Sequence, residues 1–256
     1  MSFPCHGKWR TDVDMNRILF EAWECRDGQV VLTDHRAKHL RAVLRAGSGD
    51  VFRVGEVAGF SGTGEVVRLS EDEVVMAVHL TEPPVRPKLD LLLALPRPKV
   101  LRRLLPQISA LGVDRIFLTN AARVERPYFD THVLKADTMR ALLVEGLMQC
   151  GGTWRPRVQV VRRLKVFLED EVAGCSDADE RILLHPTAET AWRALPAPGE
   201  RTLLALGPEG GWVAYELELF AQCQFTATRL TTGVLRSDTA CVVSLGAAVM
   251  RCGDAG

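Results

Sequence analysis

The sequence lacks an excess of charge of either sign. Its 256 residues include 32 lysines and arginines and 32 aspartates and glutamates, so the formal net charge is zero. No overall positive field therefore indicates a nucleic-acid partner, and any such surface must come from local clusters of basic residues. The seven cysteines form no CxxC pair and no dense disulfide framework. This pattern is typical of a reducing compartment, and we expect the protein in the cytoplasm.

Three further features are missing. No stretch of 18 apolar residues occurs, and the first 14 residues lack the apolar segment of a signal peptide, so we expect neither membrane spanning nor secretion. The spacing of the histidines and cysteines indicates no metal site. No GxGxxG motif follows the first strand of the C-terminal part, which argues against a dinucleotide-binding Rossmann enzyme.

The composition that is present suffices for two globular domains. With 47% hydrophobic and 25% charged residues, the chain can build cores and remain dissolved. Its length exceeds that of most single domains. Three prolines, Pro83, Pro84 and Pro87, interrupt regular structure and suit an extended linker. We therefore predict an N-terminal extension (1–14), a small domain (15–84) and a larger domain (85–256).

The small domain is predicted to be a β-barrel or sandwich. Short runs rich in β-branched residues alternate with turn residues between positions 15 and 80. One helix interrupts them, because Asp34 is a suitable N-cap for a segment at 35–45 with Leu40, Val43 and Leu44 on one face. Its other faces are basic, which fits either a solvated surface or contact with phosphates.

The larger domain is predicted to be α/β, with a parallel sheet covered on both faces. The apolar run at 89–95 is typical of a strand buried on both sides. Helices and strands then alternate along the chain, as in a parallel sheet. The expected elements are strand 89–95, helix 99–111, strand 115–119, helix 133–149, strand 158–161, helix 165–173, strand 181–185, strand 202–206, helix 214–222, strand 225–230 and helix 238–251.

Three loops follow strands of this predicted sheet, at 184–186, 206–212 and 230–240. Ligands bind such sheets at the carboxyl ends of the strands. In the second loop, Gly207, Gly210 and Gly211 allow the backbone to approach a flat ligand closely, and Pro208 stiffens the turn. Taken alone, the same glycines fit a tight surface turn equally well.

The order and spacing of these loops resemble the SPOUT class of methyltransferases. The match of segment 206–211 together with Val234-Leu235-Arg236 is specific for this class. The motif at 111–116, with Glu145 and Gln149, narrows the resemblance to one family within the class. The chain is similar to the family that methylates nitrogen 3 of a uridine in 16S ribosomal RNA. The resemblance implies a C-terminal SPOUT domain with a trefoil knot, S-adenosylmethionine as cofactor, a PUA-like RNA-binding β domain, and a homodimer that needs no metal.

The resemblance also assigns residues. The cofactor-binding residues it implies are Leu184, His185, Pro186, Leu206, Gly207, Pro208, Glu209, Gly210, Gly211, Leu230, Thr231, Val234, Leu235 and Thr239. The RNA-binding residues it implies are Arg17, Arg41, Arg45 and Arg123.

Arg236 is the catalytic candidate, because its charge would favour the deprotonated uracil ring. The alternative is a structural salt bridge to Asp238 or Glu209. Glu209 would orient Arg236 or act as a first-turn acid of the next helix. His185 is expected to be a packed, hydrogen-bonded residue rather than a general base.

Several positions depart from the family pattern. Residues of the family, most of them charged, are replaced at Pro106, Gln107, Ala110, Gly152 and Gly233. The cofactor site is therefore better retained than the substrate site. Replacement phosphate contacts could come from four arginines, Arg102, Arg103, Arg155 and Arg157. Pro106 should kink or shorten its predicted helix. A methyltransferase acting on another RNA, and a catalytically silent RNA-binding assembly protein, therefore remain as alternatives.

Overall fold

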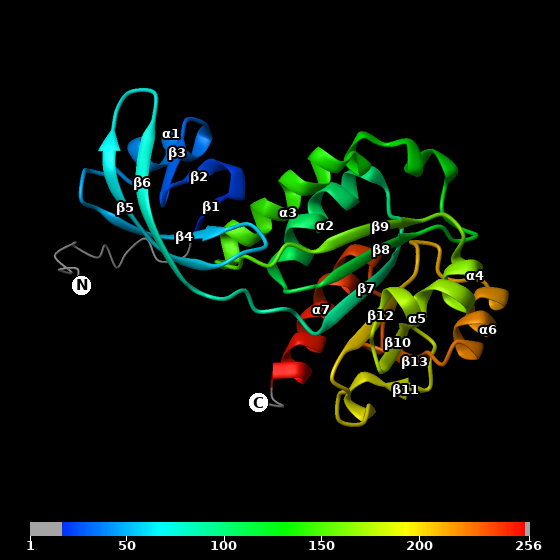
Figure 1. Ribbon diagram of the computed structural model, residues 1–256. Helices are drawn as coiled ribbons and strands as arrows, with labels where there is room; N and C mark the ends of the chain where they lie inside the picture. Colours follow the sequence, from blue (N-terminus) through cyan, green and yellow to red (C-terminus); the bar gives the residue numbers. More distant parts are fainter. Residues whose placement is uncertain (1–16, 254–256) are drawn as a thin grey trace. The chain divides into compact units, whose positions relative to one another are not determined.

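The structure, a computed structural model, describes residues 17–253 (Figure 1). The expected extension at 1–14 lies outside them. The chain forms two compact units: the first comprises the described part of Met1–Val85 together with Leu147–Arg155, and the second comprises Arg86–Gly146 and the described part of Pro156–Gly256. No helix within residues 17–253 is long and apolar enough to cross a membrane.

The first unit is a six-stranded sheet with one α-helix. The sheet order is β1-β4-β5-β6-β3-β2, in which β1 pairs with β4 in parallel and the other pairs are antiparallel. Its core includes Phe20, Leu32, Leu40 and Met76, all fully buried. The strands are β1 (Ile18–Phe20), β2 (Cys25–Arg26), β3 (Gln29–Leu32), β4 (Val51–Glu56), β5 (Ser61–Leu69) and β6 (Val74–Glu82), and β5 and β6 form a long hairpin (Figure 1).

The helix of this unit, α1 (His35–Ala42), begins as predicted and ends early. The Asp34 side chain accepts a hydrogen bond of 2.9 Å from the Arg36 amide, which confirms the N-cap. Arg45 then adopts φ +49°, and the Ala46 amide donates to the Leu40 carbonyl, so the chain turns away after the helix. Val43, the C-cap residue, is 64% exposed whereas Leu40 is fully buried, so the two do not share one face as predicted.

The second unit contains a seven-stranded sheet in which all the pairs are parallel, which confirms the predicted α/β class. The order is β11-β13-β10-β12-β7-β8-β9. Every residue of the central strand β7 is buried. The strands are β7 (Leu89–Ala94), β8 (Arg115–Thr119), β9 (Arg157–Val161), β10 (Glu180–Leu184), β11 (Thr190–Ala191), β12 (Thr202–Leu206) and β13 (Thr226–Arg229).

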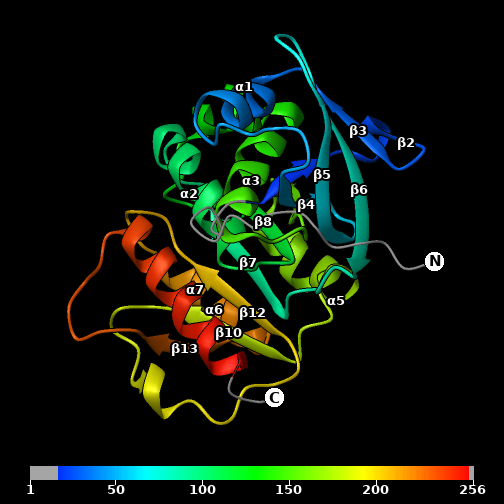
Figure 2. The ribbon, with the colours of Figure 1, turned by 90° about the vertical axis from the view of Figure 1, so that its left-hand side faces the viewer.

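Helices cover both faces of this sheet. In Figures 1 and 2, α2, α3 and α7 lie on one side and α4, α5 and α6 on the other, and α7 packs against β12 and α2. The helices are α2 (Pro98–Ala110), α3 (Ala136–Cys150), α4 (Leu164–Val166), α5 (Val172–Cys175), α6 (Ala214–Gln222) and α7 (Ser237–Gly253); a π-helical segment, Phe167–Glu171, joins α4 to α5.

Helix α2 continues through Pro106 to Ala110, so the expected shortening did not occur. Two contacts with α3 hold this part of the helix. The Pro106 carbonyl packs so closely against Gly146 that a β-carbon there would meet its oxygen at 2.0 Å. The Ser109 hydroxyl donates a hydrogen bond of 2.8 Å to the Leu143 carbonyl. Tertiary packing therefore offsets the hydrogen bond that proline cannot make.

The segment Leu147–Arg155 groups with the first unit by its contacts, whereas the sequence analysis places it within the larger domain at 85–256. The Arg17 amide donates to the Met148 carbonyl at 3.2 Å, and the Ala58 amide donates to the Thr153 carbonyl at 2.8 Å. A methyl group of Thr153 also packs onto Gly55, where a β-carbon would approach it to 2.6 Å. These contacts join positions 95 to 131 residues apart in the sequence.

A buried ion cluster ties the amino ends of three strands of the second unit. Arg201 lies just before β12, and its Nη2 is 2.9 Å from both Asp90 Oδ1 in β7 and Asp114 Oδ2 before β8. Ser176 donates a hydrogen bond of 2.7 Å to Asp90. Burial raises the pKa of Asp90 despite these partners. The cluster fixes the edge of the sheet opposite to the loops described next.

Candidate functional site

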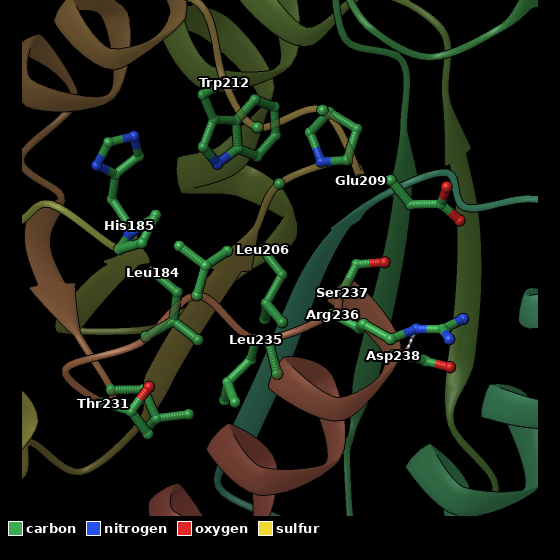
Figure 3. Close-up of a pocket in the computed structure, with 18 of the residues that line it drawn as sticks. Leu184, His185, Leu206, Glu209, Trp212, Thr231, Leu235, Arg236, Ser237 and Asp238 are labelled. Carbon is green, nitrogen blue, oxygen red and sulfur yellow. Dashed lines mark ion pairs between the residues drawn. The ribbon is translucent and has the colours of Figure 1, made fainter.

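The three predicted loops meet at one cavity of about 570 Å³ (Figure 3). Strands β13, β10 and β12 are neighbours in a parallel sheet, so their carboxyl ends lie at the same edge. The cavity is lined by Val100, Leu184, His185, Pro186, Leu206, Gly207, Pro208, Glu209, Gly210, Gly211, Trp212, Leu230, Thr231, Gly233, Val234, Leu235, Arg236, Ser237, Asp238 and Ala240.

The predicted residues are nearly all among these lining residues. Every proposed cofactor residue except Thr239 lines the cavity, and so does Arg236. Thr239 lies on the first turn of α7 and lines a neighbouring groove with α2 instead. The predicted cofactor and catalytic residues omit six lining residues, Val100, Trp212, Gly233, Ser237, Asp238 and Ala240, of which all but Val100 lie within the predicted loops. Trp212 could have been found as the residue next to Gly211, whereas Val100 comes from a helix about a hundred residues earlier and left no signal.

The second loop owes its shape to contact between Gly207 and Trp212. A β-carbon on Gly207 would stand 2.9 Å from Trp212 Nε1, and the indole is only 4% exposed. The indole ring packs edge-on against Phe220, with 4.8 Å between ring centroids. Gly211 has φ +75°, and its amide donates to the Pro208 carbonyl at 2.8 Å, which closes a turn. The loop is therefore both a tight turn and a wall of the cavity.

Glu216 and Arg123 hold this loop against the segment after β8. The buried Glu216 carboxylate accepts hydrogen bonds from the Ala122 amide at 2.7 Å and the Val213 amide at 2.9 Å. The Arg123 guanidinium donates to the Gly210 carbonyl. Arg123, predicted to bind RNA, thus supports the cavity wall from an exposed position.

Arg236 has an exposed guanidinium and one weak ion pair. Its side chain is 81% exposed, and its Nε lies 3.6 Å from Asp238 Oδ1. Glu209 pairs with Arg97 instead, at 3.3 Å, so the predicted orientation of Arg236 by Glu209 did not occur. The salt bridge considered as the alternative role for Arg236 therefore exists with Asp238, and the guanidinium remains open to solvent.

The His185 ring is hydrogen-bonded, as predicted. Its Nδ1 lies 3.0 Å from the Thr187 hydroxyl, and its backbone amide donates to the Thr228 carbonyl at 3.0 Å. Among residues 17–253, no group of three His, Cys, Asp or Glu side chains could hold a metal ion.

The remaining arginines predicted to bind RNA lie in the first unit. Arg17 is 14% exposed and pairs with Glu82 at 3.6 Å, and burial lowers the pKa of its guanidinium despite that carboxylate. Arg41 donates to the Ser70 carbonyl at 2.8 Å. Arg45 is exposed at the turn after α1. Arg45 is therefore more accessible than Arg17 to a nucleic acid.

Three comparisons relate the chain to known proteins. Residues 81–249 match the model of the RNA methyltransferase domain. The chain is 31% identical over 232 residues to ribosomal RNA small subunit methyltransferase E of Treponema pallidum, covering 88% of this chain and 87% of the relative. It is 25% identical to ribosomal RNA small subunit methyltransferase E 1 of Borreliella burgdorferi, covering 90% and 95%.

A solved structure shares the fold. Ribosomal RNA small subunit methyltransferase E from Neisseria gonorrhoeae, crystallised with S-adenosylmethionine, superposes with a TM-score of 0.73 at 18% identity. The match covers 92% of this chain and 98% of that one.

Proposed function

The chain belongs to the family of RNA methyltransferases, and on this basis we propose that it transfers the methyl group of S-adenosylmethionine to nitrogen 3 of a uridine in 16S ribosomal RNA. The main support is the cavity at the carboxyl ends of β10, β12 and β13, where all three loops meet. The segments that line it are those that the resemblance assigns to the cofactor. The relatives named above are ribosomal RNA methyltransferases.

The cavity fits the proposed cofactor in size and chemistry. Leu184, Leu206 and Leu235 supply apolar surface for a flat ring, and the glycine-rich loop supplies backbone polar groups. The Trp212 indole nitrogen is buried at this wall without a hydrogen-bond partner among the described residues, so a ligand acceptor would satisfy it. When bound, S-adenosylmethionine supplies an electrophilic methyl group on a sulfonium.

The work of the protein is then to position the ring nitrogen and to stabilise the charge that develops on the ring. Arg236 is proposed for the second task. Its guanidinium is exposed at the cavity and its ion pair with Asp238 is long, so it can turn towards a uracil carbonyl oxygen at little cost.

Three architectural features are part of the proposal. The meeting of the loops after β10, β12 and β13 supports a trefoil knot, since that arrangement is what the resemblance implies. The six-stranded sheet with α1 supports a PUA-like RNA-binding domain. Val249 and Met250, 39% and 67% exposed on α7, support a homodimer that would cover them. The proposed place of action is the cytoplasm.

Two measurements test the function. Titration calorimetry should detect S-adenosylmethionine binding with a micromolar Kd, and absence of binding would favour a silent RNA-binding protein instead. Mass spectrometric mapping of ribosomal RNA from cells with and without the gene should show one methyluridine that depends on it. A methyl group that appears elsewhere would identify a different RNA substrate.

A further inference from the structure

A second cavity adjoins the one proposed for the cofactor. It is a groove of about 320 Å³ between α2 and α7, and the two cavities share Val100 and Asp238. Arg103 and Gln107 contribute polar groups from α2, and Val242 and Val243 contribute apolar surface from α7. All these residues belong to the second unit, so the groove is part of one compact body.

Asp238 occupies the junction between the two cavities. Its Oδ2 lies 3.1 Å from Arg103 Nη2, and its Oδ1 accepts a hydrogen bond of 3.0 Å from the Thr239 amide. Arg236 Nε lies 3.6 Å from the other carboxylate oxygen, Oδ1, and the Asp238 charge also acts on the buried Cys241 thiol. Figure 3 shows the Asp238 carboxylate beside the Arg236 guanidinium at the edge of the cofactor cavity. Because the Arg103 contact is shorter than the Arg236 contact, the Arg236 side chain could turn towards a substrate while Arg103 keeps the Asp238 carboxylate in place.

The chemistry of the groove suits a pyrimidine nucleotide. Leu104, Val242 and Val243 offer apolar contact to a flat ring. The Gln107 amide can donate to a ring carbonyl oxygen, and the 59% exposed Arg103 side chain can also reach an anionic phosphate. The polarity and charge of the lining residues therefore suit one nucleotide of a single-stranded RNA segment.

We propose that the groove between α2 and α7 binds the methyl-accepting nucleotide, and that Asp238 takes the proton from its ring nitrogen. This inference rests on the proposed function and names the substrate subsite next to the cofactor. The nitrogen–hydrogen bond breaks as the proton passes to the Asp238 carboxylate, and the nitrogen electron pair forms the new bond to the methyl carbon. The sulfur–carbon bond breaks with its electron pair on sulfur, which leaves neutral S-adenosylhomocysteine.

The other acid–base groups at the cofactor cavity are less suited to this step. Glu209 is paired with Arg97 at 3.3 Å, much as Asp238 is paired with Arg103, so pairing does not separate the two carboxylates; the His185 ring is bonded to Thr187. Neither residue lines the groove, whereas Asp238 lines both cavities. A proton acceptor must reach the atom that loses the proton, so its position at the junction selects Asp238.

Arg103→Met tests the nucleotide subsite, with Lys99→Met as the matched control. Lys99 is an exposed cation on the same helix that lines neither cavity. We expect Arg103→Met to raise the KM for 16S ribosomal RNA about tenfold and to weaken RNA retention in filter binding, while the calorimetric Kd for S-adenosylmethionine stays unchanged. Lys99→Met should match the wild type in all three. An unchanged KM and unchanged retention in Arg103→Met would refute the subsite.

Asp238→Asn tests the proton transfer. We expect kcat to fall about 100-fold or more, the usual contribution of a general base, with S-adenosylmethionine binding retained. The residual rate should rise in proportion to hydroxide concentration, because solvent must then remove the proton, and Asp238→Glu should restore part of kcat. If Asp238 only held the two arginines, Asp238→Asn would keep the pH profile of the wild type, and that result would overturn the inference.

Different results would refute the proposed methyltransferase function and the proposed role of Asp238. A wild-type protein that binds no S-adenosylmethionine would refute the proposed function and this inference with it. A wild type that binds and methylates, together with an Asp238→Asn variant of normal kcat, would refute the inference alone.

Discussion

Replacing Gly207 by alanine should destabilise the second unit by about 1–3 kcal/mol, the usual cost of overpacking. The new β-carbon would stand 2.9, 3.1 and 3.2 Å from three atoms of the Trp212 indole. The indole cannot retreat, since it is 4% exposed and packs against Phe220. At roughly 2–4 °C per kcal/mol for a chain of this size, the melting temperature should fall by about 2–12 °C.

Gly210→Ala is the matched control for this prediction. Its β-carbon would also approach an atom at 2.9 Å, but that atom is Cδ of the exposed, flexible Arg123 side chain. Neither glycine has a positive φ, so backbone strain does not separate the two substitutions. Gly210→Ala should therefore change the free energy of unfolding by less than about 0.5 kcal/mol in urea denaturation.

A double-mutant cycle locates the cost at the indole. In a Trp212→Leu background the clash is absent, so Gly207→Ala should cost at least about 1 kcal/mol less than in the wild type. Equal stability of the two alanine variants, or additive costs in the cycle, would refute the packing argument.

The other predictions concern charge and reactivity. Arg236→Ala should lower kcat about 100-fold or more while the melting temperature stays the same, because the side chain is 81% exposed; unchanged activity would remove Arg236 from the mechanism. Burial alone would raise the pKa of Glu24, but hydrogen bonds from Arg36 and the Glu21 amide bring it below the ordinary 4.5. A lowered pKa means stability that is present above pH 4.5 and lost as the pH falls, so Glu24→Gln should cost about 1–2 kcal/mol at pH 7 and progressively less in acid. Glu73→Gln, which breaks the exposed Arg68 pair, should cost less than about 0.5 kcal/mol, and equal costs would contradict this comparison. Burial raises the pKa of the Cys241 thiol to about 12, so iodoacetamide at pH 8 should label exposed Cys150 but not Cys241 in the native protein, as peptide mass mapping would show.

The sequence was most informative where local pattern and burial agree. The apolar run of β7 and the alternation that follows it predicted the α/β sheet, with element ends correct to within about three residues for most elements. The three loops were predicted together because parallel strands place their carboxyl ends at one edge. The two-residue strand β11 and the π-helical segment Phe167–Glu171 left no periodic signal and were missed.

Features set by a single backbone conformation or by distant contacts could not be predicted. Val43 fits the helical pattern, but the positive φ of Arg45 ends the helix before that pattern does. Val100 lines the cavity only because of where α2 lies in the fold. The position of α2 also decides that Glu209 pairs with Arg97, the N-cap residue of this helix, rather than with Arg236. Residue spacing along the chain carries no information on such contacts.

The membership of Leu147–Arg155 in the first unit has a consequence for how the gene can be divided. Codons 1–85 do not encode the whole first unit, because the unit also includes Leu147–Arg155. The carbonyl groups of Met148 and Thr153 in that segment accept hydrogen bonds from the backbone of the N-terminal part. A fragment expressed from those codons would leave the Arg17 and Ala58 amides and the surface beside Gly55 uncovered. Recombination that transplants the N-terminal portion onto another enzyme must therefore bring along a second, non-contiguous stretch of coding sequence.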